Sequence, residues 1–285
     1  MRTDDLARMA ARAAARVRAD LGVGPAEGVC PFDIAEGLEV PVRLVPLPSL
    51  EGMYSPEPRP TILVSAERPP GRRRYTCGHE IGHHVFGHGT RLDELREDLT
   101  VDTWNPDELV AQRFAAALMM PKLAINSAFA KRGWSVADVT PEMIFVVAQE
   151  LGVGFTTLIA HLERTLRLLS PSVAEEYRRV RLPKLRERLA GFEVEHDLVV
   201  VDQHWGRRTV DLEVGDVVVL PMGAEVTGAC ASVIAGHEGY WVACSPGIGA
   251  VSIAVGRPDL SLRVSRRAFT GLARYRHLED VADGE

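Results

Sequence analysis

Two histidines with a glutamate between them are the residues of this sequence best suited to chemistry. They stand in the string His79-Glu80-Ile81-Gly82-His83. On a helix both imidazoles point from one face and can bind one zinc ion at about 2.0–2.1 Å each. Glu80 lies one step around the helix, where it can take a proton from a water on the zinc without being a ligand. The pattern is expected by chance roughly 0.02 times in such a chain, and the alternative is two core histidines on an ordinary helix.

A catalytic zinc also needs a third protein ligand and one open position. The metzincin pattern would require glycine at 86 and histidine at 89, but the sequence has Phe86 and Gly89. Glu108, at the start of a second helix, is the candidate, with Asp107 as its nearest competitor. Small residues would let that helix approach the first one closely: Ala111, Ala115 and Ala116. An acid at a helix start also favours the helix dipole without any metal.

Both segments resemble a known family. Residues 74–83 read Arg-Tyr-Thr-Cys-Gly-His-Glu-Ile-Gly-His and resemble the R-[FY]-T-x-x-H-E-x-G-H segment of ImmA/IrrE-type metallopeptidases. Residues 108–121 resemble that family's E-x-x-A-N-x-F-A-A…LLMP helix. The resemblance covers residues 1–125 well and 126–190 loosely.

The resemblance implies a zinc metalloendopeptidase of the gluzincin type. Its metal ligands would be His79, His83 and Glu108, and Glu80 would act as base and then as proton donor to the leaving amine. Its substrate would be a helix-turn-helix repressor, cleaved to induce stress-response or mobile-element genes. One position departs from the family, because Gln112 stands where an asparagine amide could orient a ligand histidine. The competing hypothesis is a non-enzymatic DNA-binding or protein-binding transcription regulator with a structural metal site, for which a general base has no use.

Other residues near this helix have open roles. We expect His84 and His88 to be structural or solvent-facing rather than zinc ligands. Tyr54, Tyr75 and several distant histidines are candidate donors to the oxyanion of a tetrahedral intermediate, and the sequence does not choose among them. The segment Thr61 to Val64 is either an edge strand that pairs with the substrate backbone or an ordinary sheet strand.

The elements that must position these residues follow from periodicity and from chain-breaking residues. We expect helices at residues 4–20, 31–37, 75–86 and 107–120, and strands at 40–45 and 61–64. Residues 52–60 are predicted to be a turn region, and Pro69 to Gly71 to break the chain before the zinc helix. Residues 91–108 contain seven acids and two bases and are predicted to form a solvated loop.

In the rest of the chain, the residue pattern changes from helical to β-like near residue 190. Residues 140–169 are typical of a helix-turn-helix with Gly152 in its turn, and residues 162–189 carry a net charge of +4. This module either contacts nucleic acid weakly or a repressor, or is a packing module with a solvated face. Further on, we expect strands at 198–201, 209–212, 217–220, 232–235 and 240–243. A late arginine cluster has no acids nearby in the sequence and is predicted to be a solvated edge: Arg263, Arg266, Arg267, Arg274 and Arg276.

Composition limits the remaining classes. The 285 residues include 33 Lys+Arg and 39 Asp+Glu, a net charge of −6, and 46% apolar residues, which is typical of a globular protein. The four cysteines show no CxxC spacing, and we find no secretory signal or membrane span, so we expect a cytoplasmic protein without membrane contact. The predicted class is α+β: a zincin-like peptidase domain over 1–125, a helical, helix-turn-helix-like module over 126–190, and a β-rich sensor or regulatory domain over 191–285.

Overall fold

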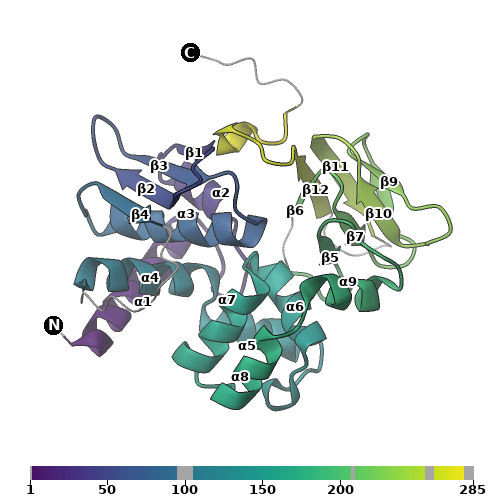
Figure 1. The fold of residues 1–285 in the computed structure, drawn as a ribbon, viewed down its shortest axis with the longest axis horizontal. Coiled ribbons are helices and arrows are strands. Elements are labelled where there is room, and N and C mark those ends of the chain that lie inside the picture. The colour runs from purple at the N-terminus through teal and green to yellow at the C-terminus, as the bar shows by residue number, and fades with distance from the viewer. Residues whose placement is uncertain (1, 95–104, 207–208, 254–259, 279–285) are drawn as a thin grey trace. The chain divides into compact units, whose positions relative to one another are not determined.

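The computed structural model describes residues 2–94, 105–206, 209–253 and 260–278. These residues form two compact units (Figure 1). The first runs to Asn126 and also takes in Leu151–Gly154 and Thr270–Arg274, and the second holds Ser127–Glu150 and most residues from Phe155 onward. The expected mixture of helices and strands is confirmed, while the finer limits at 125 and 190 stay predictions.

One mixed sheet supports the first unit. Its described strands are Val42–Val45 (β1), Leu50–Ser55 (β2), Thr61–Ser65 (β3), Arg91–Glu94 (β4) and Gly271–Leu272 (β13). They lie in the order β13-β1-β3-β2-β4. β3 is parallel to β1 and antiparallel to β2, and β2 is antiparallel to β4. β3 is thus an interior strand, and β4 is an edge strand among the described strands.

Helices cover this sheet and one another. They are Thr3–Asp20 (α1), Pro31–Gly37 (α2), Pro70–Val85 (α3), Pro106–Met119 (α4) and the first part of Lys122–Ala130 (α5). α3 packs against β2 and β3 and also against α4, and α1 packs against α4 (Figure 1). The buried stripe of α1 contains Leu6, Ala10, Ala14 and Val17, a spacing of one helix face. α3 is therefore held between the sheet and a second helix.

Three expectations for this unit are wrong. The predicted turn at 52–60 overlaps β2, which continues through Ser55. Pro70 begins α3 instead of breaking the chain, because a proline's missing N–H and fixed φ suit the first helical position. β4 lies where a loop was predicted, and residues 95–104 of that loop are outside the described part of the chain.

The second unit begins with helices. They are the end of α5, then Pro141–Leu151 (α6), Phe155–Ala160 (α7), Pro171–Arg178 (α8) and Leu182–Ala190 (α9), and a π-helical turn, His161–Thr165, extends α7. Gly152 has φ +72° in the turn after α6, a conformation that glycine adopts without strain. No single described helix is long and apolar enough to cross a membrane; only the pair 141–151 and 155–165 passes that test jointly, across a 104° bend.

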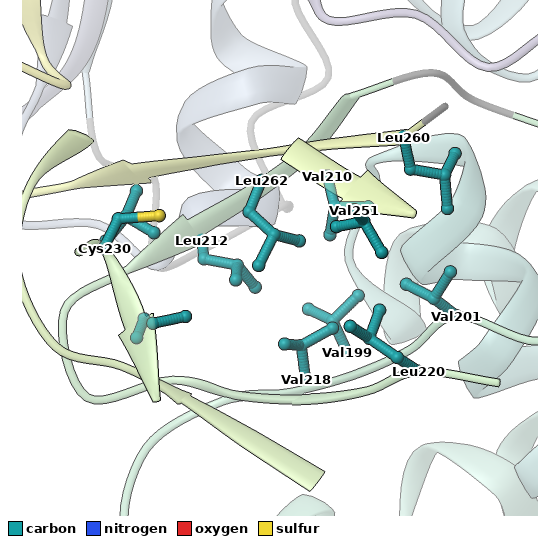
Figure 2. Packing of buried hydrophobic residues seen from close by; sticks show 13 residues of the cluster. Val199, Val201, Val210, Leu212, Val218, Leu220, Cys230, Val251, Leu260 and Leu262 are labelled. Atoms are coloured by element: carbon teal, nitrogen blue, oxygen red, sulfur yellow. The ribbon is translucent and has the colours of Figure 1, made fainter. Parts of the chain in front are cut away.

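Two four-stranded sheets follow. Their strands are Leu198–Val200 (β5), Thr209–Glu213 (β6), Val217–Val219 (β7), Glu225–Thr227 (β8), Ala231–Val233 (β9), Tyr240–Ala243 (β10), Gly247–Ser252 (β11) and Leu260–Ser265 (β12). The orders are β5-β7-β10-β9 and β6-β12-β11-β8. Valine and leucine side chains from both sheets form one core (Figure 2). Sequence patterns indicated β5, β6, β7 and β10 and the last two residues of β9, but missed β8, β11 and β12.

Arginines of the C-terminal cluster have acid partners that the sequence did not predict. Arg263 Nε lies 2.6 Å from Asp211 Oδ1, and Arg276 Nη2 lies 3.2 Å from the same oxygen. Arg267 Nη2 lies 2.8 Å from Asp216 Oδ1. Their acids are about fifty or more residues away in sequence, and only the fold brings them close. The predicted solvated edge is wrong for Arg263 and Arg276, whose side chains are 14% and 6% exposed, whereas Arg267 is 40% exposed and lies at the surface.

Candidate metal centre

The centre is built where α3 and α4 approach each other most closely. A Cβ placed on Gly82 would lie 2.9 Å from the Ala111 Cα, and one on Gly78 would lie 3.6 Å from the Ala115 Cβ. Such contact requires small residues on both helices, since a larger side chain would hold the backbones apart. The expected close approach of the alanine-rich helix is therefore confirmed. The glycine partners on α3 were missed, although their spacing of four residues is visible in the sequence.

A helix cap fixes the start of α4. The Asn105 side-chain oxygen accepts hydrogen bonds from the backbone N–H of Asp107, at 3.0 Å, and of Glu108, at 3.5 Å. Such a cap satisfies donors that the first helical turn leaves unpaired. The cap therefore places two acidic side chains beside the histidine face of α3.

Three donor atoms converge between the helices. His79 Nε2 and His83 Nε2 are 3.0 Å apart, and Glu108 Oε2 lies 3.2 Å from the first and 3.5 Å from the second. Zinc bonds of about 2.0–2.1 Å in tetrahedral geometry place ligand atoms roughly 3.3 Å apart. The three atoms thus have the spacing of one face of a zinc tetrahedron. Among the described residues only these three form such a group, and Asp107 is not part of it.

The electrostatics of the three groups are coupled. Hydrogen bonds from His79 and His83 hold the pKa of Glu108 well below its usual range. His83 is fully buried, while 37% of the Glu108 side chain is exposed. The carboxylate is therefore ionised at neutral pH, as a metal ligand must be.

Glu80 lies on the side of α3 that faces the sheet. Its side chain is buried. A Cβ on Gly52 would lie only 2.8 Å from Glu80 Oε1 and 2.5 Å from Thr76 Cγ2. The glycine in β2 therefore makes room for the carboxylate, a role that sequence analysis missed because Gly52 was assigned to a turn.

The two candidate tyrosines have partners of their own. Tyr54 Oη lies 3.1 Å from His84 Nδ1, and burial raises the pKa of Tyr54 and lowers that of His84. Tyr75 Oη donates to the Gln112 carbonyl at 3.4 Å, and burial raises the Tyr75 pKa to about 12. Both phenols are thus protonated at neutral pH, and the choice between them as oxyanion donors stays open.

His88, which the sequence predicted to be structural or solvent-facing, contacts His83 directly. Its Nδ1 lies 2.8 Å from His83 Nδ1, and its Nε2 lies 3.6 Å from Asp107 Oδ1. The contact uses the His83 nitrogen that faces away from the three-atom group. The His83 ring is therefore held from both sides.

Residues 36–163 match the family model described as the IrrE N-terminal-like domain, a peptidase family. The matched segment includes α3 and α4 with the whole three-residue group. These features define a metallopeptidase-type domain. Residues 36–163 thus match the ImmA/IrrE family, as the sequence motifs predicted. A search of curated proteins gave no match.

Proposed function

We propose that this protein is a zinc-dependent metalloendopeptidase that cleaves a helix-turn-helix transcriptional repressor. The observation that carries the proposal is the convergence of His79, His83 and Glu108 with tetrahedral spacing beside a buried Glu80. Two imidazoles and a carboxylate are a donor set that suits zinc and leaves one position open.

The proposed mechanism uses this chain's own groups for proton transfer. A zinc ion at the centre would polarise the scissile carbonyl and lower the pKa of water to about 7. Glu80 takes the proton of the attacking water and then gives it to the departing amine. Its burial against Gly52 holds the carboxylate in one place, which favours a fixed proton path.

A substrate must lie extended to be cut, and the edge strand of a sheet can hold it by backbone hydrogen bonds. Thr61 to Val64 cannot do so, because β3 pairs on both sides. Of the two alternatives for this segment, the edge strand is wrong and the ordinary sheet strand is correct. Among the described strands β4 pairs only with β2, and it follows α3 directly in the chain. β4 is therefore the proposed backbone partner of the substrate.

The rest of the function rests on family resemblance. Repressor cleavage would induce stress-response or mobile-element genes, and a repressor substrate would place the reaction in the cytoplasm. The helical module is proposed to select the repressor, and the β-rich region, with its own core, to act as a sensor.

The test is to purify any helix-turn-helix repressor encoded next to the gene for this protein and measure its cleavage, with Glu80→Gln as the informative variant. The amide keeps the size of the side chain but cannot accept the proton, so cleavage should fall by roughly 10²–10⁴-fold. Metal analysis should still find about one zinc per chain. Glu67→Gln, at an exposed acid between β3 and α3, is the matched control. Equal cleavage by Glu80→Gln and wild type would rule out the mechanism.

The competing function is a non-enzymatic regulator that binds DNA. The 104° bend after α6 is consistent with a helix-turn-helix module. Its bases are mostly paired with acids, however: Arg178 with Glu163, Arg179 with Glu175 and Arg188 with Glu142. This pairing reduces the positive field available for phosphates, so we propose at most a weak nucleic-acid contact. Repressor cleavage that requires Glu80 would decide against this alternative.

A further inference from the structure

The turn that ends α3 folds the chain back onto a proposed metal ligand. Phe86 caps the helix, and Gly87 has φ +65°. Gly87 N–H donates to the His84 carbonyl at 3.1 Å, and His88 N–H donates to the His83 carbonyl at 3.0 Å. This pair of bonds is a Schellman motif, which brings the second residue after the helix back over its last turn. In most such motifs apolar side chains meet there, but here two histidines do.

The two imidazoles meet through specific atoms. Their Nδ1 atoms are 2.8 Å apart, and the ring centroids are 4.9 Å apart at 65°. The His83 side chain is fully buried, and that of His88 is 11% exposed. Two ring nitrogens at this distance share one proton, so one ring donates and the other accepts.

The three-atom group decides which ring donates. His83 faces His79 and Glu108 through Nε2, so a metal there takes the Nε2 lone pair and leaves the His83 proton on Nδ1. His88 Nδ1 must then accept, and its own proton lies on Nε2. That nitrogen lies 3.6 Å from Asp107 Oδ1, slightly beyond hydrogen-bond length, so the carboxylate attracts the N–H proton through its charge. The His83 proton thus lies on Nδ1 and faces His88, and the His88 proton lies on Nε2 and faces Asp107.

We propose that His88, which lies beside Asp107, is a positioning residue that fixes the tautomer and ring orientation of His83. The inference deepens the proposed zinc peptidase and rests on it. The family resemblance predicted such a role for residue 112, but Gln112 is exposed and the contact that orients His83 comes from the turn after α3. Asp107 and Glu108 thus act together, one through His88 and the other directly on the metal.

The test measures zinc affinity of the full chain by competition with a chromophoric chelator. His88→Phe keeps the ring and its stacking on Phe86 but removes the acceptor, so affinity should fall about 10–100-fold. His88→Asn restores an acceptor near the Nδ1 position and should recover most of the affinity. His84→Phe is the matched control, because its ring contacts Tyr54 instead, and its affinity should stay within about threefold of wild type.

A second readout separates orientation from general packing. The absorption spectrum of the cobalt(II)-substituted protein should change in His88→Phe and return in His88→Asn, because it reports ligand geometry. If His88→Phe does not fold, Asp107→Asn carries the test and should weaken zinc binding by about 2–10-fold.

Wild-type zinc affinity and an unchanged cobalt spectrum in His88→Phe, or in Asp107→Asn, would overturn the inference while the zinc peptidase stands. A wild-type protein that binds no zinc would overturn both.

Discussion

The helix pair α3–α4 and the β-rich core bury polar groups in opposite ways. In the β-rich region the core is valine and leucine (Figure 2), and the buried Asp216 pairs with Arg267 across the fold. In the helix pair, two histidine nitrogens and a carboxylate oxygen are gathered within 4.8 Å of one another without an arginine or lysine among them. The first arrangement neutralises its charges internally, and the second concentrates electron-pair donors at one point.

The two regions are therefore stabilised by different means. Matched ion pairs and apolar packing favour the folded state. Convergent donors favour it only when a proton or a metal joins them. Variants of the two regions should therefore fail differently, one in stability and the other in metal binding or catalysis.

The largest effect is expected in the β-rich core. Leu262 is fully buried on β12, an interior strand, so Leu262→Ala should lower the free energy of unfolding by about 2–5 kcal/mol. Denaturant unfolding measures the change. Ile248→Ala, at a residue 59% exposed on β11, should change it by less than about 0.5 kcal/mol. Lower zinc content in folded Leu262→Ala would contradict the separation of the two regions.

Gly52→Ala should damage catalysis while leaving the metal in place. Its Cβ would lie 2.5 Å from Thr76 Cγ2 and 2.8 Å from Glu80 Oε1, so the carboxylate must move. A shift of about 1 Å can cost roughly 10²-fold in rate. Repressor cleavage and zinc content are measured together, with Gly89→Ala, which meets no atom within 4 Å, as the control. Loss of zinc along with activity would show that Gly52 supports the helix rather than Glu80.

Gly82→Ala should separate the two helices. The new methyl would face the Ala111 backbone at 2.9 Å, and overpacking of this kind costs about 1–3 kcal/mol. Zinc binding should weaken as well, because the ligands are divided between α3 and α4. Gly78→Ala, whose methyl would meet the flexible Met119 Sδ at 3.2 Å, should be much milder. The two variants are compared by thermal unfolding and chelator competition, and equal effects would argue against a backbone contact.

The smallest effect concerns pH in the metal-free protein. The pKa of Glu108 is lowered by His79 and His83, so the carboxylate contributes stability above its ordinary pKa of 4.5, and this contribution is lost as pH falls toward the lowered value. Because the side chain is 37% exposed, we expect less than about 1 kcal/mol. Wild type and Glu108→Gln should therefore differ in unfolding free energy near pH 6, and the difference should shrink steadily as pH falls below 4.5. A difference independent of pH would contradict the assignment.

The sequence by itself determined which donor groups could meet and much of the scaffold that brings them together. The spacing of His79, Glu80 and His83 predicted donors on one helix face, and the helix at 107–120 with its small residues was correctly expected to pack against it. These features depend on local periodicity and on residue size, which one short segment of chain expresses completely.

Only the tertiary structure decided what depends on residues far apart. It placed β3 inside the sheet, put Gly52 beside Glu80, and gave Arg263 an acid partner more than fifty residues distant. It also showed His88 against His83, which needs the left-handed turn at Gly87 as well as the helix. Strand order, cross-chain ion pairs and side-chain contacts depend on which surfaces meet, and no local pattern of residues specifies that.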